Sequence, residues 1–134
     1  MCKDEKLSFI DKIADLFLRF CPQMSDDVRY WVACQFALES NFGNSRIAKT
    51  RNNYCGMKVP VCRVSLNDAA TGFASFSSLD DCVLDYCYWL AWNKFQSDQL
   101  WNLSLFILRL RACKYCPDLD YTDKITQLFT QFKS

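Results

Sequence analysis

The chain has 134 residues, of which 51% are hydrophobic, 16% aromatic and 23% charged, which is enough material for one domain with a sizeable core. Only three glycines and three prolines are present, so an all-β sandwich built from many tight turns is disfavoured. The net charge of +1 is too balanced for a protein that binds nucleic acid by neutralising many phosphates. Histidine is absent, which excludes histidine-dependent triads, Cys–His proteases and HExxH zinc sites.

The first half of the chain has the pattern of three helices. Apolar residues at helical spacing predict a helix over residues 6–20, which Pro22 ends. Ser25 has the features of an N-cap, and the helix after it is expected to end near Gly43. A short basic helix is predicted over residues 45–50.

The second half is expected to hold a small β-element and three more helices. Residues 59–76 are rich in β-formers and predict a hairpin. A strongly periodic helix follows over residues 79–90, and a last amphipathic helix covers residues 125–132. Between them, residues 100–110 are apolar nearly all round, which is typical of a helix at the centre of a core. We therefore predict a mainly α fold of the α+β type, with about six helices around a central apolar helix and a small β-hairpin lobe, in one domain over residues 1–134.

The pattern of apolar and charged residues predicts neither a membrane-spanning segment nor a signal peptide. No apolar run approaches the roughly 20 residues needed to cross a bilayer. Asp11, Lys12 and Asp15 interrupt the apolar stretch that a signal peptide would need. We therefore expect a protein made in the cytoplasm without a signal peptide and without membrane insertion.

The nine cysteines are many for a chain of this size, but their number is odd and the core looks large enough without cross-links. Three of them lie inside helical patterns: Cys34, Cys82 and Cys87. We expect mostly reduced, buried thiols. The pair Cys113 and Cys116 has the spacing of half a zinc site, but Cys55 and Cys62 are too far apart to complete it. We expect a capped helix end there, and neither a metal nor another cofactor.

Glu39 is out of pattern in the second predicted helix. It falls on the apolar stripe, eleven residues or about three turns after Val28. Burial and the negative end of the helix dipole would both raise its pKa, as suits a general acid at near-neutral pH. In the alternative interpretation, Glu39 lies at the edge of the stripe, reaches water and has no catalytic role.

Five motifs resemble, in order, the glucosaminidase family of bacterial and phage peptidoglycan hydrolases, glycoside hydrolase family 73, with its flagellar-muramidase-like and endolysin-like members. The motifs are Ala-Leu-Glu-Ser-Asn-Phe-Gly-Asn-Ser at 37–45, Asn-Asn-Tyr-Cys-Gly-Met-Lys at 52–58, Phe-Ala-Ser-Phe-Ser-Ser at 73–78, Asp-Tyr at 85–86 and Tyr-Cys-Pro-Asp-Leu-Asp-Tyr-Thr-Asp-Lys-Ile at 115–125. The resemblance spans about residues 25–132.

The resemblance implies a lysozyme-like fold with a cleft between the helical body and the β-lobe. It implies bacteriolytic cleavage of the β-1,4 bond between N-acetylglucosamine and N-acetylmuramic acid in peptidoglycan, with Glu39 protonating the leaving oxygen. Tyr115 matches a tyrosine that lines the cleft and orients the N-acetyl group or a water. The matching substrate-binding positions are Asn53, Tyr54, Gly56 and Tyr121. For Tyr54 and Tyr115, an aromatic side chain packed at a domain edge is an equally good interpretation.

The predicted β-lobe is shorter than in the family. Asp68 is the only carboxylate between Lys58 and Phe73. It is a candidate for the second catalytic carboxyl, and the alternative is that the acetamido group of the substrate takes that part. A shortened lobe also leaves open an inactive peptidoglycan-binding or structural module of a wall-penetrating machine. We expect a monomer whose partner is the glycan strand and which reaches the cell wall after release or delivery.

Overall fold

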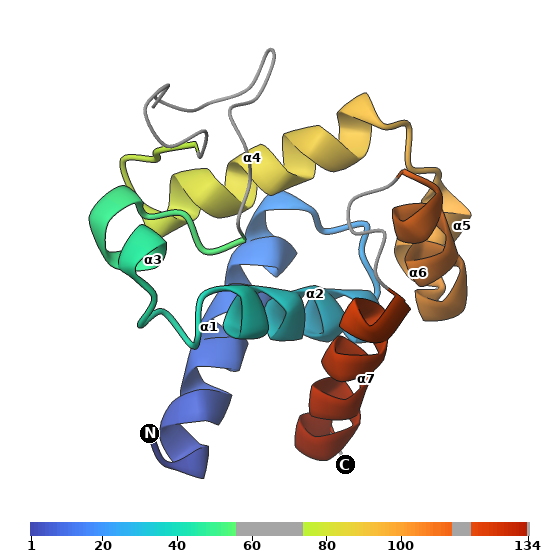
Figure 1. The fold of residues 1–134 in the computed structure, drawn as a ribbon. Helices are drawn as coiled ribbons and strands as arrows, with labels where there is room; N and C mark the ends of the chain where they lie inside the picture. Colours follow the sequence, from blue (N-terminus) through green and yellow to red (C-terminus); the bar gives the residue numbers. More distant parts are fainter. Residues whose placement is uncertain (56–73, 114–118, 134) are drawn as a thin grey trace.

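The computed structural model describes residues 1–55, 74–113 and 119–133. Seven helices lie in these ranges (Figure 1). In chain order they are α1 (Lys3–Phe20), α2 (Asp26–Glu39), α3 (Arg46–Arg51), α4 (Leu79–Trp92), α5 (Ser97–Trp101), α6 (Leu103–Ala112) and α7 (Leu119–Lys133). The mainly α class predicted from the sequence is confirmed.

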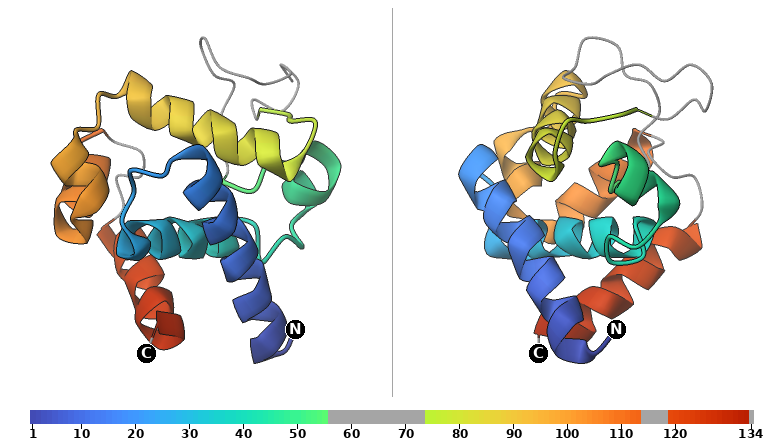
Figure 2. Two further views of the ribbon diagram at one scale, coloured as in Figure 1. Left: turned by 180° about the vertical axis from the view of Figure 1, so that it is seen from behind. Right: turned by 90° about the vertical axis from the view of Figure 1, so that its left-hand side faces the viewer.

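Helix α2 is the centre of the fold. Nine of its 14 residues are buried, more than in any other described helix. Helices α1 and α7 lie on either side of α2 (Figures 1 and 2). Both chain ends lie at the bottom of Figure 1, and α4 crosses the opposite end of the molecule, at the top. Three aromatic rings join these layers: Phe17 of α1, Phe36 of α2 and Tyr86 of α4 stack edge to face with centroids 5.4–5.6 Å apart.

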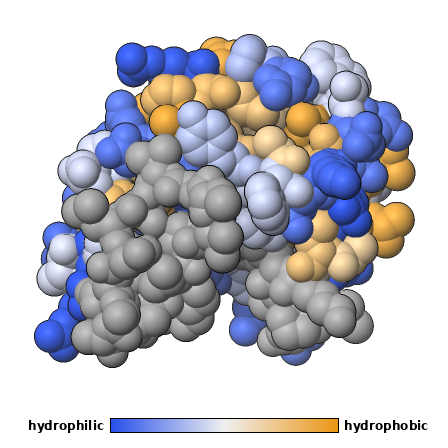
Figure 3. Space-filling view, turned by 90° about the horizontal axis from the view of Figure 1, so that it is seen from above, coloured by the Kyte–Doolittle hydropathy of each residue, from blue (hydrophilic) through white to orange (hydrophobic). Residues whose placement is uncertain are grey.

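The prediction of one central apolar helix over residues 100–110 is wrong, and the described residues hold seven helices where about six were predicted. The segment is divided into α5 and α6 at Asn102, whose side chain accepts a hydrogen bond from the Leu105 backbone N–H and so starts a new helix. Only Phe106 and Leu110 of α6 are buried, whereas Leu108 is 65% exposed. A sequence that is apolar all round does not specify which face packs inward, and here the helix lies at the flank. Figure 3 shows the resulting apolar surface on the side of α5 and α6.

The N-cap predicted at Ser25 is confirmed, and two more serines cap α3 and α4 in the same way. Ser25, Ser45 and Ser78 each accept a hydrogen bond from the backbone N–H three residues later, at 3.1–3.2 Å. Helix α2 ends at Glu39, four residues before the predicted end at Gly43. The residues in between form a turn that belongs to the candidate site.

The predicted hairpin over residues 59–76 lies mostly outside the described residues. Its last part, residues 74–76, is extended and is joined to the end of α3. The Phe76 N–H donates to the Arg51 carbonyl at 2.8 Å, and the side chain of Asn52 donates to the Phe76 carbonyl at 3.0 Å. This pairing holds the chain that follows α3 against the chain that enters α4.

Within the described ranges, no helix combines the length and the apolar character needed to cross a membrane. No disulfide joins the cysteines of these ranges, and four of them are buried: Cys21, Cys34, Cys55 and Cys82. Cys62 and Cys116 lie outside the described residues. The predicted pair of Cys113 and Cys116 is therefore described only at Cys113.

Candidate active site

Glu39 is the last residue of α2, and it reaches solvent at the edge of the apolar stripe, so the prediction that it lies on the buried face is wrong. Partial burial raises the pKa of the Glu39 carboxyl, and the Tyr121 hydroxyl of α7 opposes that rise. The negative end of the α2 dipole acts in the same direction as burial. Glu39 is therefore solvent-accessible and holds a proton to a higher pH than an ordinary glutamate, as a general acid requires.

A tight turn directly follows Glu39 and fixes the end of the helix. The Ser40 hydroxyl donates to the Phe36 carbonyl at 2.7 Å and accepts from the Gly43 N–H at 2.9 Å. The Phe42 N–H returns to the Ala37 carbonyl at 2.7 Å. Three successive residues of this turn, Asn41, Phe42 and Gly43, have positive φ angles of 48°, 55° and 82°. Two of them are not glycine, and strained backbone of this kind is common at functional sites.

Replacing Ser40 by Ala is expected to loosen this turn. The Ser40 side chain is fully buried and makes two hydrogen bonds, so the variant leaves the Gly43 N–H without its acceptor, at a cost of about 1–3 kcal/mol in the free energy of unfolding. For a domain of this size, the thermal midpoint should fall by roughly 4–10 °C in circular dichroism. Ser104→Ala at an exposed position of α6 is the matched control, and an equal effect of the two substitutions would contradict the role given to Ser40.

Behind Glu39 lies a small group of buried polar side chains. The Tyr86 hydroxyl of α4 donates to Gln35 Oε1 of α2 at 2.8 Å. Gln35 Nε2 and the Tyr121 hydroxyl are both buried and complete no hydrogen bond of ordinary geometry within the described residues. Burial raises the pKa of Tyr121, and the neighbouring charge of Glu39 adds to the rise, so the phenol stays protonated. The site thus keeps neutral donors beside the Glu39 carboxyl.

The structure brings Glu39 and Tyr121 together. The substrate-binding role of Tyr121 stays a prediction. Gln35 and Tyr86 were not predicted as site residues. The available signal for Gln35 was its place on the buried stripe of α2, four residues before Glu39, since positions i and i+4 share a helix face. For Tyr86 the available signal was the Asp-Tyr motif at 85–86, to which the resemblance gave no role in the site.

Asn53 and Tyr54 follow α3, and Tyr54 lies close to the turn after Glu39. The Asn53 side chain is buried and donates to the Ala74 carbonyl at 2.9 Å, so this amide links the chain after α3 to the chain that leads into α4. The half-buried ring of Tyr54 lies 6.2 Å from the ring of Phe9. Gly43 lies against both rings. A Cβ atom at this position would come within 3.0 Å of the Phe9 ring and 3.3 Å of the Tyr54 ring, which is closer than ordinary van der Waals contact. Tyr54 is thereby packed next to the Glu39 turn.

Three of the predicted site residues lie outside the described residues: Gly56, Asp68 and Tyr115. Their predicted roles stay predictions. Among the residues that the structure does describe, no group of three or more cysteine, aspartate or glutamate side chains is placed to hold a metal ion.

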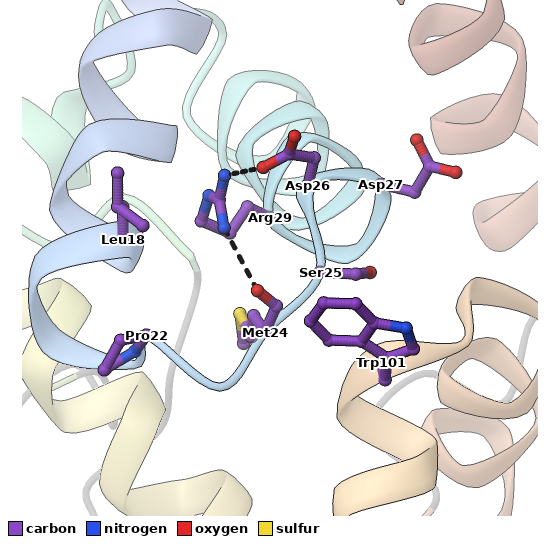
Figure 4. Close-up of a pocket in the computed structure, with 8 residues that line it drawn as sticks. All are labelled: Leu18, Pro22, Met24, Ser25, Asp26, Asp27, Arg29 and Trp101. Carbon is purple, nitrogen blue, oxygen red and sulfur yellow. Dashed lines mark hydrogen bonds and ion pairs between the residues drawn. The ribbon is translucent and has the colours of Figure 1, made fainter.

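A pocket of about 700 Å³ lies at the opposite end of α2 (Figure 4). It is lined by Leu18, Pro22, Met24, Ser25, Asp26, Asp27, Arg29 and Trp101. Arg29 donates to the Met24 carbonyl at 3.0 Å and pairs with Asp26, so its charge is already neutralised. Since a helix of 14 residues is about 20 Å long, this pocket is too far from Glu39 to be part of the same site.

Comparison with known proteins places the chain in a class of enzymes. A family model described as Glucosaminidase, mannosyl-glycoprotein endo-β-N-acetylglucosaminidase, matches residues 29–134. The class is that of the glycoside hydrolases. The chain belongs to the glucosaminidase family, which confirms the resemblance found in the sequence. Among curated proteins, none matches the chain by sequence.

Two solved structures share the fold. One is a chain of a type VI secretion system effector–immunity complex from Pseudomonas protegens, with a TM-score of 0.72 and 16% identity over 98% of this chain and 93% of that one. The other is the catalytic domain of the autolysin Auto from Listeria monocytogenes, with a TM-score of 0.71 and 20% identity over 99% of this chain and 87% of that one.

Proposed function

We propose that the protein is a peptidoglycan hydrolase that cleaves the β-1,4 bond between N-acetylglucosamine and N-acetylmuramic acid, with Glu39 as general acid. The observation that carries the proposal is the Glu39 carboxyl itself. In a chain of the glucosaminidase family, it stands at the end of the central helix with a raised pKa. The whole chain, residues 1–134, forms one lysozyme-like catalytic domain.

Peptidoglycan is the preferred substrate for two reasons. The chain belongs to the glucosaminidase family, and its five sequence motifs resemble those of the peptidoglycan hydrolases of that family. The two structures of like fold come from an autolysin and a bacterial secretion-effector complex, and both are consistent with a bacterial wall substrate. Release or delivery to the cell wall would bring the enzyme to this substrate, and we expect that the reaction needs no cofactor.

In the proposed reaction, protonated Glu39 donates its proton to the glycosidic oxygen as the bond breaks. The Ser40 turn fixes the direction of the carboxyl. The neutral Tyr121 and Gln35 side chains lie beside it and favour the carboxylate that forms when the proton has left. We expect the half-buried ring of Tyr54 to pack against a sugar ring of the substrate.

The direct test is a turbidity assay on purified peptidoglycan with the wild type and Glu39→Gln. Loss of lysis in the variant alone supports the proposal. If neither protein cleaves the substrate but both sediment with it, the chain is an inactive glycan-binding module instead. Reductive labelling of the new reducing ends identifies the sugar at the cleaved bond and separates a glucosaminidase from a muramidase.

Tyr121→Phe is expected to move the alkaline limb of the pH–activity profile to higher pH. The Tyr121 hydroxyl lowers the pKa of Glu39, so its removal lets Glu39 keep its proton to a higher pH. The maximal rate should fall by only about two- to tenfold, because one neutral hydrogen-bonding group is lost.

The matched control is Tyr30→Phe, whose hydroxyl donates to Asp11 at 2.9 Å and belongs to another part of the molecule. Its pH profile should equal that of the wild type. An alkaline limb that stays in place, or moves to lower pH, in Tyr121→Phe would show that Tyr121 does not act on Glu39.

Asp68→Asn is expected to lower kcat by less than about tenfold, because we propose that the acetamido group of the substrate, rather than Asp68, assists the departure of the leaving group. The four residues that follow Asp68 in the sequence are Ala, Ala, Thr and Gly, and such small side chains offer little packing to hold a carboxylate in place. De-N-acetylated peptidoglycan should then be a poor substrate. A loss of about 10²-fold or more in Asp68→Asn would instead identify Asp68 as a general base.

A further inference from the structure

Two buried cysteines from distant parts of the sequence lie in contact. The Sγ atoms of Cys55 and Cys82 are 3.7 Å apart, although 27 positions separate the residues in the chain. Cys55 is 2% exposed and Cys82 is fully buried. The two sulfur atoms of a disulfide bond lie about 2.05 Å apart, so the Sγ atoms of Cys55 and Cys82 need to approach each other by less than about 2 Å to form one.

The backbone around this pair is already fixed. The Tyr54 N–H donates to Cys82 Sγ at 3.4 Å, and the neighbouring Asn53 side chain donates to the Ala74 carbonyl at 2.9 Å. Cys82 lies in the first helical turns of α4, whose N-cap is Ser78. Folding itself therefore brings these two thiols together, and no rearrangement of helices is needed.

Three other buried or half-buried cysteines differ in whether they have a second thiol beside them. Cys34 is buried in α2, and burial alone raises the pKa of its thiol to about 12. Cys87 of α4 donates to Cys21, which lowers the pKa of Cys21 and raises that of Cys87, so these two thiols are also neighbours. A test of the first pair must therefore distinguish Cys82 from Cys87.

We propose that Cys55 and Cys82 form an intrachain disulfide bond when the chain folds under oxidising conditions, and that the bond fastens the segment 53–55 to α4.

The oxidant is a small disulfide of the glutathione type. One cysteine thiolate attacks it, forming a mixed disulfide and releasing one thiol. The second thiolate then displaces the other thiol. The two cysteines lose two protons and two electrons, and the oxidant becomes two thiols. Because the native thiols are buried, the exchange takes place before packing is complete.

The experiment is to unfold and reduce the protein, and then to refold it either in a mixture of reduced and oxidised glutathione or in dithiothreitol. Remaining thiols are alkylated in denaturant, and the protein is digested with trypsin and Asp-N. Trypsin separates Cys55 from Cys62 at Lys58, and Asp-N separates Cys82 from Cys87 before Asp85. The expected product is the linked peptide pair that contains Cys55 and Cys82, and it should be absent after refolding in dithiothreitol.

The bond should also raise the thermal midpoint. A cross-link across this many residues reduces the entropy of the unfolded chain, and the oxidised protein should melt roughly 5–12 °C above the reduced one. Cys55→Ala and Cys82→Ala should each abolish this difference, and Cys34→Ala should keep it. Comparing the two redox forms of the same variant separates the effect of the bond from any effect of the substitution on folding.

Peptide mapping of the wild type shows whether Cys55 and Cys82 are linked, even if a variant fails to fold. Complete alkylation of Cys55 and Cys82 after refolding in glutathione, or linkage of either to another cysteine as the main product, would overturn the proposal. Neither measurement depends on glycosidase activity, so the inference stands or falls independently of the proposed function.

Discussion

Replacing Glu39 by Gln is expected to lower the rate of peptidoglycan hydrolysis by about 10²–10⁴-fold, while leaving the fold and glycan binding intact. The amide has nearly the same shape as the carboxylic acid, but it cannot deliver a proton to the leaving oxygen. The carboxyl lies at the exposed end of α2, so the substitution leaves the buried core unchanged. The measurements are the initial rate of turbidity loss and co-sedimentation with insoluble peptidoglycan.

The stability of Glu39→Gln should change with pH in a defined direction. The pKa of Glu39 is raised in the folded protein, so the native state binds the proton more tightly than the unfolded chain does. The wild type therefore loses stability as pH rises through the ordinary pKa of a glutamate and then the raised one, and the variant does not. At pH 7 the variant should melt at the same temperature as the wild type or higher, and this gain should disappear in acid.

Glu5→Gln is the matched control, because Glu5 is the only other glutamate in the chain and lies exposed in the first turn of α1. It should retain wild-type activity at every pH. Comparable lysis by Glu39→Gln and the wild type would contradict the proposed role of Glu39. A variant that binds peptidoglycan less well than the wild type would indicate that Glu39 serves in binding.

The sequence predicted well those parts of the fold that depend on local chemistry. Serine N-caps and apolar spacing located most helices, because both signals act within a few residues. The position of α6 could not be predicted in this way, since its apolar residues cover every face and only tertiary packing selects Phe106 and Leu110 for the core. Asn102 was the overlooked local signal, because its side chain caps a new helix at that point.

The candidate site was predictable to a similar extent. Glu39 could be found as a carboxylate on an apolar stripe, and Tyr121 through the family resemblance. The buried hydrogen bond between Gln35 and Tyr86 joins residues 51 positions apart, and such pairing depends on the packing of α2 against α4. The two strained residues before Gly43 could not be foreseen either, because Phe42 in particular rarely adopts a positive φ.

Gly43→Val is expected to lower the free energy of unfolding by roughly 2–5 kcal/mol. Gly43 has a φ of 82°, and a side chain in this region costs about 1–2 kcal/mol, most for a β-branched residue. Its Cβ would lie 3.0 Å from the Phe9 ring and 3.3 Å from the Tyr54 ring, and overpacking of this kind costs about 1–3 kcal/mol more. The thermal midpoint should fall by about 7–18 °C in circular dichroism.

The same substitution should lower activity in the fraction that remains folded, because it displaces Tyr54 and the Ser40 turn that directly follows Glu39. Asn41→Gly is the control at the same turn. Asn41 is exposed and has a φ of 48°, so glycine there relieves backbone strain and should leave the thermal midpoint unchanged or slightly higher. Equal destabilisation by both substitutions would show that the turn tolerates no change at all. Destabilisation by Gly43→Val alone shows that the close packing of Gly43 against Phe9 and Tyr54 links the end of α2 to the chain that follows α3.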